Sequence, residues 1–372
     1  MSHTSDVVIV GGGVIGLTTA FRLASERLSV TLVDRQQVGQ EASWAGAGML
    51  PPGSPGHVDS PEAKLRALSH SLWPGLTAEL QELTGIDTGF RRCGSVQLCP
   101  PSAASAEDLA RGWHSEGIAC EILDAARLQS RIPGLRPTFQ HGVFVPDFAQ
   151  VRNPRHLKAL SLACRRRGVT FFENCPDVRL SSDEGRVVEL TTGLQRISAG
   201  HVCITAGAWT PLLLEPLGIK LPVSPVRGQI AQIRVSSLPF HSVVELGKQY
   251  LVPRPDGLIL IGSTEERVGY EKGATLGGVS SLLEFAGNLI PALEQATLER
   301  SWSGLRPASP NELPFIGELA GLSNLSIACG HFRSGLQMSP GTAALLTNVV
   351  LGRVCVKSVD WVNVPLLDMI SR

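Results

Sequence analysis

A glycine-rich turn between two apolar stretches constrains this 372-residue chain more than any other feature. Asp6–Val10 predicts a buried strand, Leu17–Arg27 a helix and Ser29–Val33 a second strand, so the segment indicates a βαβ unit. The turn has the spacing G-x-G-x-x-G, which is typical of dinucleotide binding when it joins a strand to a helix. Glycine runs also form plain turns, but here the strand, the helix and the acidic strand end all fit.

Each glycine of the motif has its own expected role. Gly11 permits the tight turn, Gly13 lets a pyrophosphate approach the backbone, and Gly16 lets the helix pack closely on the strand. The pyrophosphate would lie at free N–H groups and at the positive end of the helix dipole. Asp34 ends the second strand and is placed to accept hydrogen bonds from a ribose hydroxyl. We therefore predict that the unit binds an adenine dinucleotide.

Charge, cysteine content and hydropathy narrow the class of protein. The 33 basic and 33 acidic residues balance, so no net field favours nucleic acid or an anionic membrane. The eight cysteines show no C-x-x-C pair or metal-type spacing, and Cys203 and Cys329 are expected as small core residues. The polar leader before Val7 is too short for a signal peptide, and no apolar run could span a bilayer. We expect a cytoplasmic protein without a metal ion, a nucleic-acid partner or a membrane span.

Several helices and one small-residue segment follow the opening unit. The small residues of Glu41–Leu50 suit a segment pressed against a cofactor, with a flexible loop as the alternative. Leu65–Leu83 has helical spacing, although Pro74 should break or kink the helix. Ala106–Glu116 predicts another helix. Asn153–Arg167 predicts a further one, with its asparagine as the N-cap and the next proline at the first helical position.

The second half of the chain points to FAD as the dinucleotide. Val226–Val235, Tyr250–Val252 and Leu258–Ile261 predict an antiparallel sheet. A second strand–glycine–helix unit then covers Leu325–Leu351, where Pro340 should place the helix start near the preceding serine. A nucleotide domain that is interrupted by a sheet and resumed this late fits FAD better than NAD. A helix N-terminus at the flavin can stabilise negative charge on the reduced ring.

These elements predict an α/β (α+β) fold in which a Rossmann-like, two-dinucleotide FAD-binding domain is interleaved with a substrate domain built on an antiparallel sheet. We assign residues 1–89, 143–223 and 304–372 to the FAD-binding domain. Residues 90–142 and 224–303 then form the substrate-binding domain.

Seven motifs resemble those of the FAD-dependent D-amino-acid oxidase-like (DAO) oxidoreductases, and most closely the glycine-oxidase branch of thiamine biosynthesis. They occur in family order over nearly the whole length, and Gly-Leu-Arg-Pro together with Gly-His-Phe-Arg-x-Gly is the most specific pair. The motifs are Val7–Gly16, Ala45–Leu50, Pro225–Gln229, Tyr250–Arg254, Trp302–Pro307, Pro314–Gly317 and Gly330–Gly335.

The resemblance implies a substrate site and a cofactor site. Arg306 is expected to grip the substrate carboxylate with help from Tyr250, and Arg333 to lie at the mouth of the pocket. A guanidinium fork makes two charge-assisted hydrogen bonds to a carboxylate in a geometry that lysine cannot copy. A surface or capping cation is the alternative for each arginine. The FAD is expected to be non-covalent, and its contacts are Gly11, Gly13, Val14, Ile15, Gly16, Asp34, Arg35, Ala42, Ser43, Ala47, Gly48, Met49, Val178, Ala206, Gly207, Trp209, Gly330, His331, Phe332, Arg333, Ser334, Gly335, Leu336 and Gln337.

The resemblance also implies the reaction. Glycine, sarcosine or a small D-amino acid would lose a hydride from its α-carbon to flavin N5, and the imine would hydrolyse or feed thiazole synthesis. Molecular oxygen would then be reduced to hydrogen peroxide. His331 is not expected to act as a base, because hydride transfer requires position and orientation. The alternatives are a D-amino-acid dehydrogenase with another electron acceptor, and a non-catalytic flavoprotein subunit of an amine dehydrogenase. Homo-oligomer formation stays open.

Two residues depart from the family pattern. Glu265 stands where a related glycine oxidase has an apolar residue, and Lys248 stands in place of a histidine. If these side chains face the pocket, the carboxylate could pair with the substrate ammonium, and the lysine could favour a more acidic substrate. If they face solvent, neither has a role.

Overall fold

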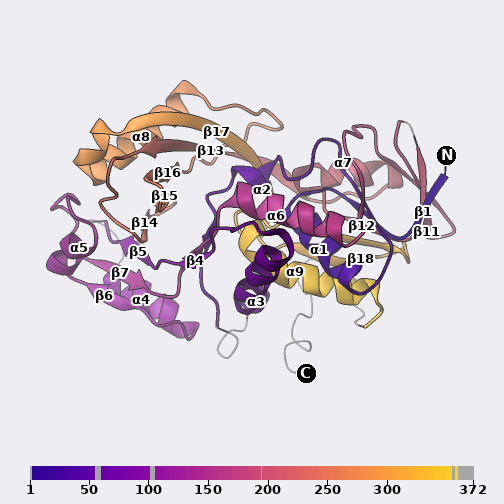
Figure 1. Ribbon diagram of the computed structural model, residues 1–372, viewed down its shortest axis with the longest axis horizontal. Coiled ribbons are helices and arrows are strands. Elements are labelled where there is room, and N and C mark those ends of the chain that lie inside the picture. The colour runs from indigo at the N-terminus through magenta and orange to yellow at the C-terminus, as the bar shows by residue number, and fades with distance from the viewer. Residues whose placement is uncertain (1, 55–59, 101–104, 194, 354–356, 359–372) are drawn as a thin grey trace.

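The computed structural model describes residues 2–54, 60–100, 105–193, 195–353 and 357–358. Two β-sheets with their own helices lie at opposite ends of an elongated molecule (Figure 1). The predicted α/β (α+β) class is confirmed. Residues 55–59, Cys355, and residues 359–372 of the predicted FAD-binding domain lie outside the described residues.

The first sheet is built around the predicted βαβ unit. Its central strand, β1 (Ser2–Val10), pairs in parallel with β12 (Arg196–Ile204) on one side and with β2 (Val30–Val33) on the other, as a doubly wound sheet requires. A hairpin of β10 (Arg179–Asp183) and β11 (Arg186–Thr191) extends the sheet, because β11 pairs with β12. The strand order is β20 (Lys357–Ser358), β18 (Phe315–Leu319), β19 (Leu325–Cys329), β12 (Arg196–Ile204), β1 (Ser2–Val10), β2 (Val30–Val33) and β9 (Thr170–Phe172).

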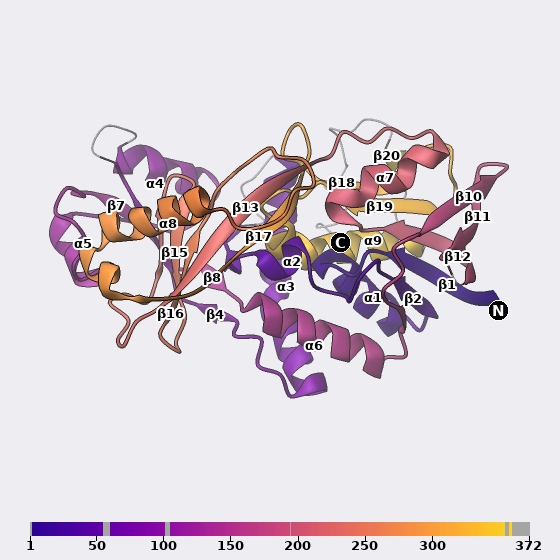
Figure 2. The same ribbon diagram turned by 90° about the horizontal axis from the view of Figure 1, so that it is seen from above.

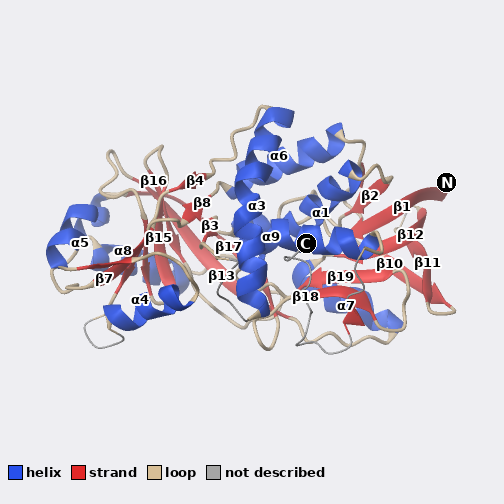
Figure 3. Cartoon of the chain, turned by 90° about the horizontal axis from the view of Figure 1, so that it is seen from below, coloured by secondary structure: helices blue, strands red, loops and turns tan. Residues whose placement is uncertain are grey.

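Helices cover both faces of this sheet. The side chains of β1 point alternately to the two faces, and each face has its own hydrophobic core. Val7 and Ile9 pack with four long helices, whereas Val8 and Val10 pack on the opposite face with Leu214 of α7 (Thr210–Leu214). Figures 2 and 3 show the long helices gathered on the side of the strands away from α7. These helices are α1 (Val14–Ser25), α3 (Pro61–Thr84), α6 (Asn153–Arg166) and α9 (Gly335–Val350).

The helix start predicted near Ser339 is wrong, and the helix that Pro74 should break or kink is not broken. α3 runs without interruption through Pro74, and the buried Trp73 beside it donates from Nε1 to the Gln337 carbonyl at 2.9 Å. α9 begins at Gly335 and contains Pro340. The carbonyl that loses its N–H partner to this proline belongs to Leu336, and it accepts the Ser339 hydroxyl at 2.8 Å instead.

The second sheet confirms the predicted antiparallel strands and adds strands from an earlier part of the chain. Leu282 and Phe285 of α8 (Leu276–Leu289) pack against this sheet and share a hydrophobic core with Ile259 and Ile261 of its strands. α4 (Ala106–Ser115) and α5 (Ala125–Arg131) accompany the earlier strands. The strand order is β17 (Thr297–Ala308), β13 (Ser224–Arg234), β16 (Leu258–Gly262), β15 (Gln249–Pro253), β14 (Val243–Leu246), β5 (Ser95–Leu98), β7 (Gly142–Val145) and β6 (Glu121–Leu123).

Short elements connect the two large sheets. The paired strands β13 and β17 run from the second sheet toward the first (Figure 2). A small sheet of β3 (Met49–Leu50), β8 (Ala149–Gln150) and β4 (Arg91–Arg92) lies beside α2 (Ala42–Ala45). For the domain division we propose that residues 143–145 and 304–308 join the substrate-binding unit, because they pair within its sheet.

The buried His156 gives the fold a pH dependence. Neither ring nitrogen has a hydrogen-bond partner among the described residues, and the ring centroid lies 4.9 Å from that of Trp73. Burial lowers the pKa of His156 to about 3, whereas an unfolded histidine titrates near 6.5. Above pH 6.5 both states are neutral and the group has no effect. Below it only the unfolded state takes up a proton, which costs about 2 kcal/mol of stability at pH 5.

We therefore expect His156→Phe to remove part of this acid sensitivity. The variant should be more stable than the wild type at pH 5 by about 2 kcal/mol in excess of any difference at pH 7.5. Urea unfolding at both pH values measures the two differences. His241→Phe, which makes the same change at an exposed side chain, is the control. An equal stability difference at the two pH values would contradict the prediction.

Candidate active site

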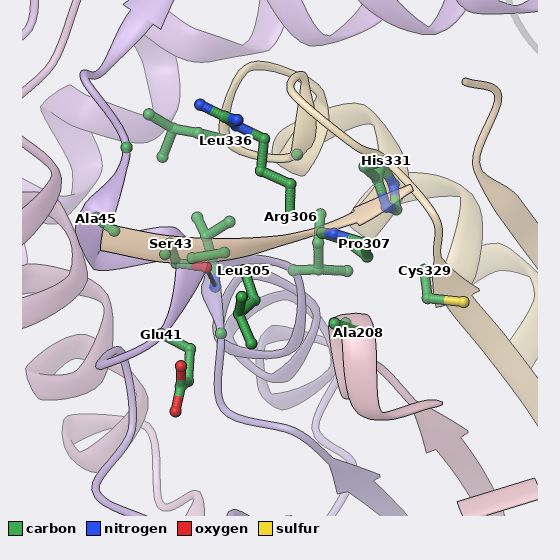
Figure 4. A pocket seen from close by; sticks show the side chains of 18 of the residues that line it. Glu41, Ser43, Ala45, Ala208, Leu305, Arg306, Pro307, Cys329, His331 and Leu336 are labelled. Carbon is green, nitrogen blue, oxygen red and sulfur yellow. Dashed lines mark hydrogen bonds between the residues drawn. The ribbon is translucent and has the colours of Figure 1, made fainter. Parts of the chain in front are cut away.

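A cavity of about 890 Å³ is lined by residues of both sheets. This volume lies at the upper end of the range for small-molecule and cofactor sites. Figure 4 shows side chains around it from α2, β17, β19 and the turn that follows, and from the first turn of α9. All the predicted cofactor contacts line the cavity except Gly16 and Gly330. The structure thus brings together residues that are more than 300 positions apart in the sequence.

The glycine turn forms one end of the cavity. Gly11 has a φ of +109°, and a Cβ on Gly16 would lie 1.9 Å from the Gly11 carbonyl oxygen, so the turn and the close helix packing both require glycine. These structural roles are confirmed. A Cβ on Gly13 would meet only the Ser43 Oγ atom, at 3.1 Å. The backbone at Gly13 is therefore open to a ligand in the cavity.

Polar side chains fix the backbone at this end. The Asp34 carboxylate accepts the Gly12 N–H at 2.6 Å and the Gln36 N–H at 2.8 Å. Burial raises the pKa of Asp34, and these two backbone bonds oppose the rise. The Val14 N–H donates to Ser43 Oγ at 2.9 Å. Two N–H groups of this turn and helix start, which we expected to be free, therefore have acceptors within the protein.

The turn after β19 forms a second wall and presents another helix start. Phe332 donates its N–H to the Pro307 carbonyl at 2.8 Å, so the turn is held against the end of β17. α9 then begins with Ser334 as its N-cap, and its first turn lines the cavity. The N-termini of both α1 and α9 therefore open onto the same cavity, with the positive ends of their dipoles.

His331 lies in this turn but is a poor candidate for a base. Its side chain is buried, and its Nε2 atom lies 3.0 Å from the Thr342 hydroxyl. Burial lowers the pKa of His331 to about 3. An imidazole with this pKa accepts a proton poorly at neutral pH.

Arg306 projects into the other end of the cavity. Figure 4 shows Leu305 and Arg306 leaving β17 on opposite sides, as alternate residues of a strand do. The guanidinium donates to the Thr264 carbonyl at 3.0 Å and to Ser263 Oγ at 2.7 Å. It lies over Gly228, where a Cβ would be 2.2 Å from Nη2. Both of these partners are neutral, and no carboxylate of the described residues forms an ion pair with Arg306.

Tyr250 lies beside this arginine. Its ring covers Gly262, its partner on the neighbouring strand, where a Cβ would be 2.4 Å from the ring. Burial lowers the pKa of Arg306, and the electrostatic interaction with Tyr250 opposes that change. The two side chains thus place a partly buried cation and a hydroxyl in one part of the cavity. This combination suits a carboxylate, because a buried charge is costly unless an opposite charge and hydrogen bonds compensate it.

Arg333, by contrast, already has an acidic partner. It forms an ion pair with Glu265, whose two carboxylate oxygens also lie 3.3 and 3.4 Å from Lys248 Nζ. Arg333 and Lys248 line the cavity, whereas Glu265 does not. The Lys248 side chain is 72% exposed. The sequence left open whether these residues face the pocket or solvent, and the structure shows Glu265 pairing with two cations at the edge of the cavity.

Two further residues hold the cavity wall, and the sequence analysis assigned them no such role. Asn153 was predicted as the N-cap of α6, but Arg152 is the cap, and Asn153 Nδ2 donates to the Ser43 carbonyl at 2.7 Å. Its buried Oδ1 atom has no hydrogen-bond partner among the described residues. Arg254 is buried and donates to the Ala47 carbonyl at 2.7 Å. Only the position of Arg254 within a family motif could have indicated its importance.

A loop from the second unit closes over the cavity wall. We define it as the crossing loop, residues 267–275, between β16 and α8. The Tyr270 hydroxyl donates to the Ala208 carbonyl at 2.9 Å, and Lys272 Nζ donates to Glu41 at 2.9 Å. Ala208 and Glu41 line the cavity (Figure 4). The crossing loop therefore ties the two halves of the molecule together at this site.

The interleaved sheets, the glycine turn and the two helix N-termini define a flavoprotein oxidoreductase. Residues 6–349 match the DAO family, described as FAD dependent oxidoreductase, and the chain belongs to this family. Its cofactor is therefore FAD. The residues present fit this group: the backbone at Gly13 is open, and Asn153, whose buried Oδ1 atom has no hydrogen-bond partner among the described residues, lines the cavity.

Three comparisons place the chain within the family. Glycine oxidase of Pseudomonas putida is 36% identical over 94% of this chain and 95% of its own length. The crystal structure of glycine oxidase from Geobacillus kaustophilus has a TM-score of 0.90 and 32% identity, covering 97% of this chain and 98% of that one. The bifunctional protein ThiO/ThiG of Trichormus variabilis is 35% identical over 94% of this chain, which spans 53% of that protein.

The described residues were also searched for two other features. No helix among them combines the length and the apolar character that crossing a membrane would need. Within the same ranges, no three His, Cys, Asp or Glu side chains gather in a way that could hold a metal ion. Cys203 and Cys329 are buried in apolar clusters, so their prediction as core residues is confirmed.

Proposed function

We propose that the protein oxidatively deaminates glycine or another small amino acid and reduces oxygen to hydrogen peroxide. The observation that carries this proposal is the environment of Arg306. A partly buried guanidinium with neutral partners lies beside Tyr250, in the cavity that also contains the glycine turn. The glycine oxidases of Pseudomonas putida and Geobacillus kaustophilus, which match nearly the whole chain, support the same reaction.

The atoms and electrons of this reaction balance with four reactants, which are the amino acid, FAD, water and oxygen. Bound FAD would supply the acceptor for a hydride from the substrate α-carbon, and the amine nitrogen would use its lone pair to form the C=N bond of an imine. Water then hydrolyses the imine to a 2-oxo acid and ammonia, or for glycine to glyoxylate and ammonia. Oxygen takes up two electrons and two protons and leaves as hydrogen peroxide.

The protein's own residues bind and orient the substrate in this proposal. Arg306 and Tyr250 hold its carboxylate, which fixes the direction of the α-carbon. Arg333 lies at the mouth of the pocket, and the predicted cofactor residues hold FAD along the glycine turn and the start of α9. Holding the reacting atoms in a productive geometry is the main contribution that hydride transfer needs from the protein. No general base is assigned.

We also propose a cytoplasmic location and a supply of product to thiazole synthesis for thiamine. The ThiO/ThiG relative, in which a region like this chain is joined to a second one, supports a biosynthetic setting. Molecular oxygen is the proposed acceptor and a small amino acid the proposed substrate. The proposal holds for a monomer or a homo-oligomer.

Flavin reduction in the absence of oxygen tests this function directly. Purified holoenzyme is mixed with glycine, sarcosine, D-alanine or D-proline, and bleaching of the flavin absorbance is followed. We expect at least one of the four to bleach it, and peroxide to form when air is admitted. Bleaching without peroxide would identify a dehydrogenase with another acceptor. A flavin that no amino acid bleaches would identify a non-catalytic subunit.

A further inference from the structure

The part of the cavity around Arg306 and Tyr250, which we call the substrate end, contains more positive charge than one carboxylate requires. Arg306, Arg333 and Lys248 all line it, and Glu245 and Tyr250 are the other titratable groups from β14 and β15 that do so. The Glu245 carboxylate accepts the Ser95 hydroxyl. If all three cations were available, a substrate with two carboxylates would fit the charge of this region best.

Glu265 changes that balance. Its carboxylate pairs with Arg333 and lies within 3.4 Å of Lys248 Nζ, while Arg306 donates only to neutral oxygen atoms. Arg333 and Glu265 are both about one-third exposed or less, so water only partly screens their attraction. Of the two arginines at this end, only Arg306 is therefore free to bind an anion.

We infer that Glu265 restricts the substrate to amino acids with a single carboxylate, because it occupies Arg333. This inference rests on the proposed function, since it names the substrate class of the same site. Glu265 itself does not line the cavity. It acts through Arg333, as a positioning residue. A second substrate carboxylate would have to displace Glu265 from Arg333, and until then it would meet a fixed negative charge at the edge of the cavity.

The sharpest test uses two substrates that differ by one carboxylate. Sarcosine and iminodiacetate share the N-substituted glycine, but one carries a methyl group where the other carries a carboxymethyl group. The sulfur analogues methylthioacetate and thiodiacetate form the same pair and cannot be oxidised to an imine. Binding of these analogues to the holoenzyme, measured by calorimetry, reports carboxylate preference without turnover.

We expect the wild type to prefer the monocarboxylate of each pair. Glu265→Gln should shift the binding ratio toward thiodiacetate by at least about tenfold, because a freed guanidinium offers a new charge-assisted hydrogen bond. The shift should appear in KM for iminodiacetate more than in kcat. Glu265→Met, which is apolar and of similar length, replaces Glu265→Gln if that variant folds poorly. Glu284→Gln changes the same charge at an exposed position of α8 and should leave the ratio unchanged.

Double variants identify the cation that is released. Adding Arg333→Met to Glu265→Gln should abolish the new preference, whereas adding Lys248→Met should keep most of it. A ratio that does not change in Glu265→Gln and Glu265→Met would overturn the inference. If adding Lys248→Met to Glu265→Gln abolished the shift toward thiodiacetate while adding Arg333→Met did not, the role of Arg333 would be overturned. If the analogues bind as expected but no amino acid reduces the flavin, the proposed function fails and the charge selection stands.

Discussion

Replacing Arg306 with alanine should lower amino-acid turnover by at least about a thousandfold while FAD stays bound. The variant removes a partly buried cation that the structure provides with two neutral hydrogen-bond acceptors and no carboxylate from the described residues. In the proposed complex the substrate carboxylate supplies the missing charge. Each factor of ten in rate corresponds to about 1.4 kcal/mol, so a loss of this size requires about 4 kcal/mol. A charge-assisted fork that also orients the α-carbon can account for that amount.

The matched control is Arg306→Lys, which keeps the positive charge and removes the planar fork. Its turnover should fall between those of the wild type and the alanine variant, because an ammonium group cannot bind a carboxylate through two parallel hydrogen bonds. Steady-state kinetics gives the turnover, and flavin absorbance after gel filtration gives the retained cofactor. Turnover within a factor of ten of the wild type in Arg306→Ala would remove Arg306 from the substrate site.

A negative charge at Gly13 should abolish FAD binding without unfolding the protein. The backbone at Gly13 has a φ of −72°, which any residue can adopt, and it is the N-cap of α1. Aspartate is a favoured residue at this position of a helix, so Gly13→Asp should not destabilise the apoprotein. Its carboxylate would face the expected position of the pyrophosphate. Two like charges 4 Å apart repel by about 4 kcal/mol at an effective dielectric constant of 20, which corresponds to about a thousandfold in Kd.

Gly13→Asn separates charge from size, because asparagine has nearly the same shape as aspartate and caps helices equally well. It should weaken FAD binding much less than Gly13→Asp does. Fluorescence titration of the apoprotein with FAD gives the two dissociation constants, and thermal unfolding of the apoproteins checks that both variants fold. Equal FAD affinities in the two variants would show that the pyrophosphate does not lie at this turn.

The parts of the fold that local sequence determines could be predicted. The glycine turn depends on a positive φ at Gly11 and on contact between backbone atoms at Gly16, and both requirements are visible in the spacing alone. The strands of the second sheet follow from alternation and turn residues. Pro340 led to a wrong helix start, because the carbonyl that loses its N–H partner accepts a serine hydroxyl instead, and Pro74 does not break α3. Such compensation depends on packing or on side-chain rotamers, which the pattern does not contain.

In the candidate active site, too, some residues could be predicted from the sequence and some contacts could not. Arg306 and Tyr250 could be named because they lie in specific family motifs, and the structure brings both to one cavity. The ion pair between Arg333 and Glu265 could not be foreseen, because it joins the turn after β19 to the segment after β16. Asn153 was likewise mistaken for a cap, since its bond to the Ser43 carbonyl forms only when α6 packs beside α2. Contacts between distant segments were the part that the sequence could not supply.

The crossing loop has a consequence for how the coenzyme is used. Tyr270 and Lys272 bind cavity-lining residues of the opposite half, so moving the two halves apart at the cavity would break these contacts. FAD retained between two halves that are tied together would act as a prosthetic group, which remains with the polypeptide from one turnover to the next. Both half-reactions must then take place at a single resident molecule, and the electron acceptor has to come to it. A freely exchanging nicotinamide coenzyme would instead be regenerated by a second enzyme.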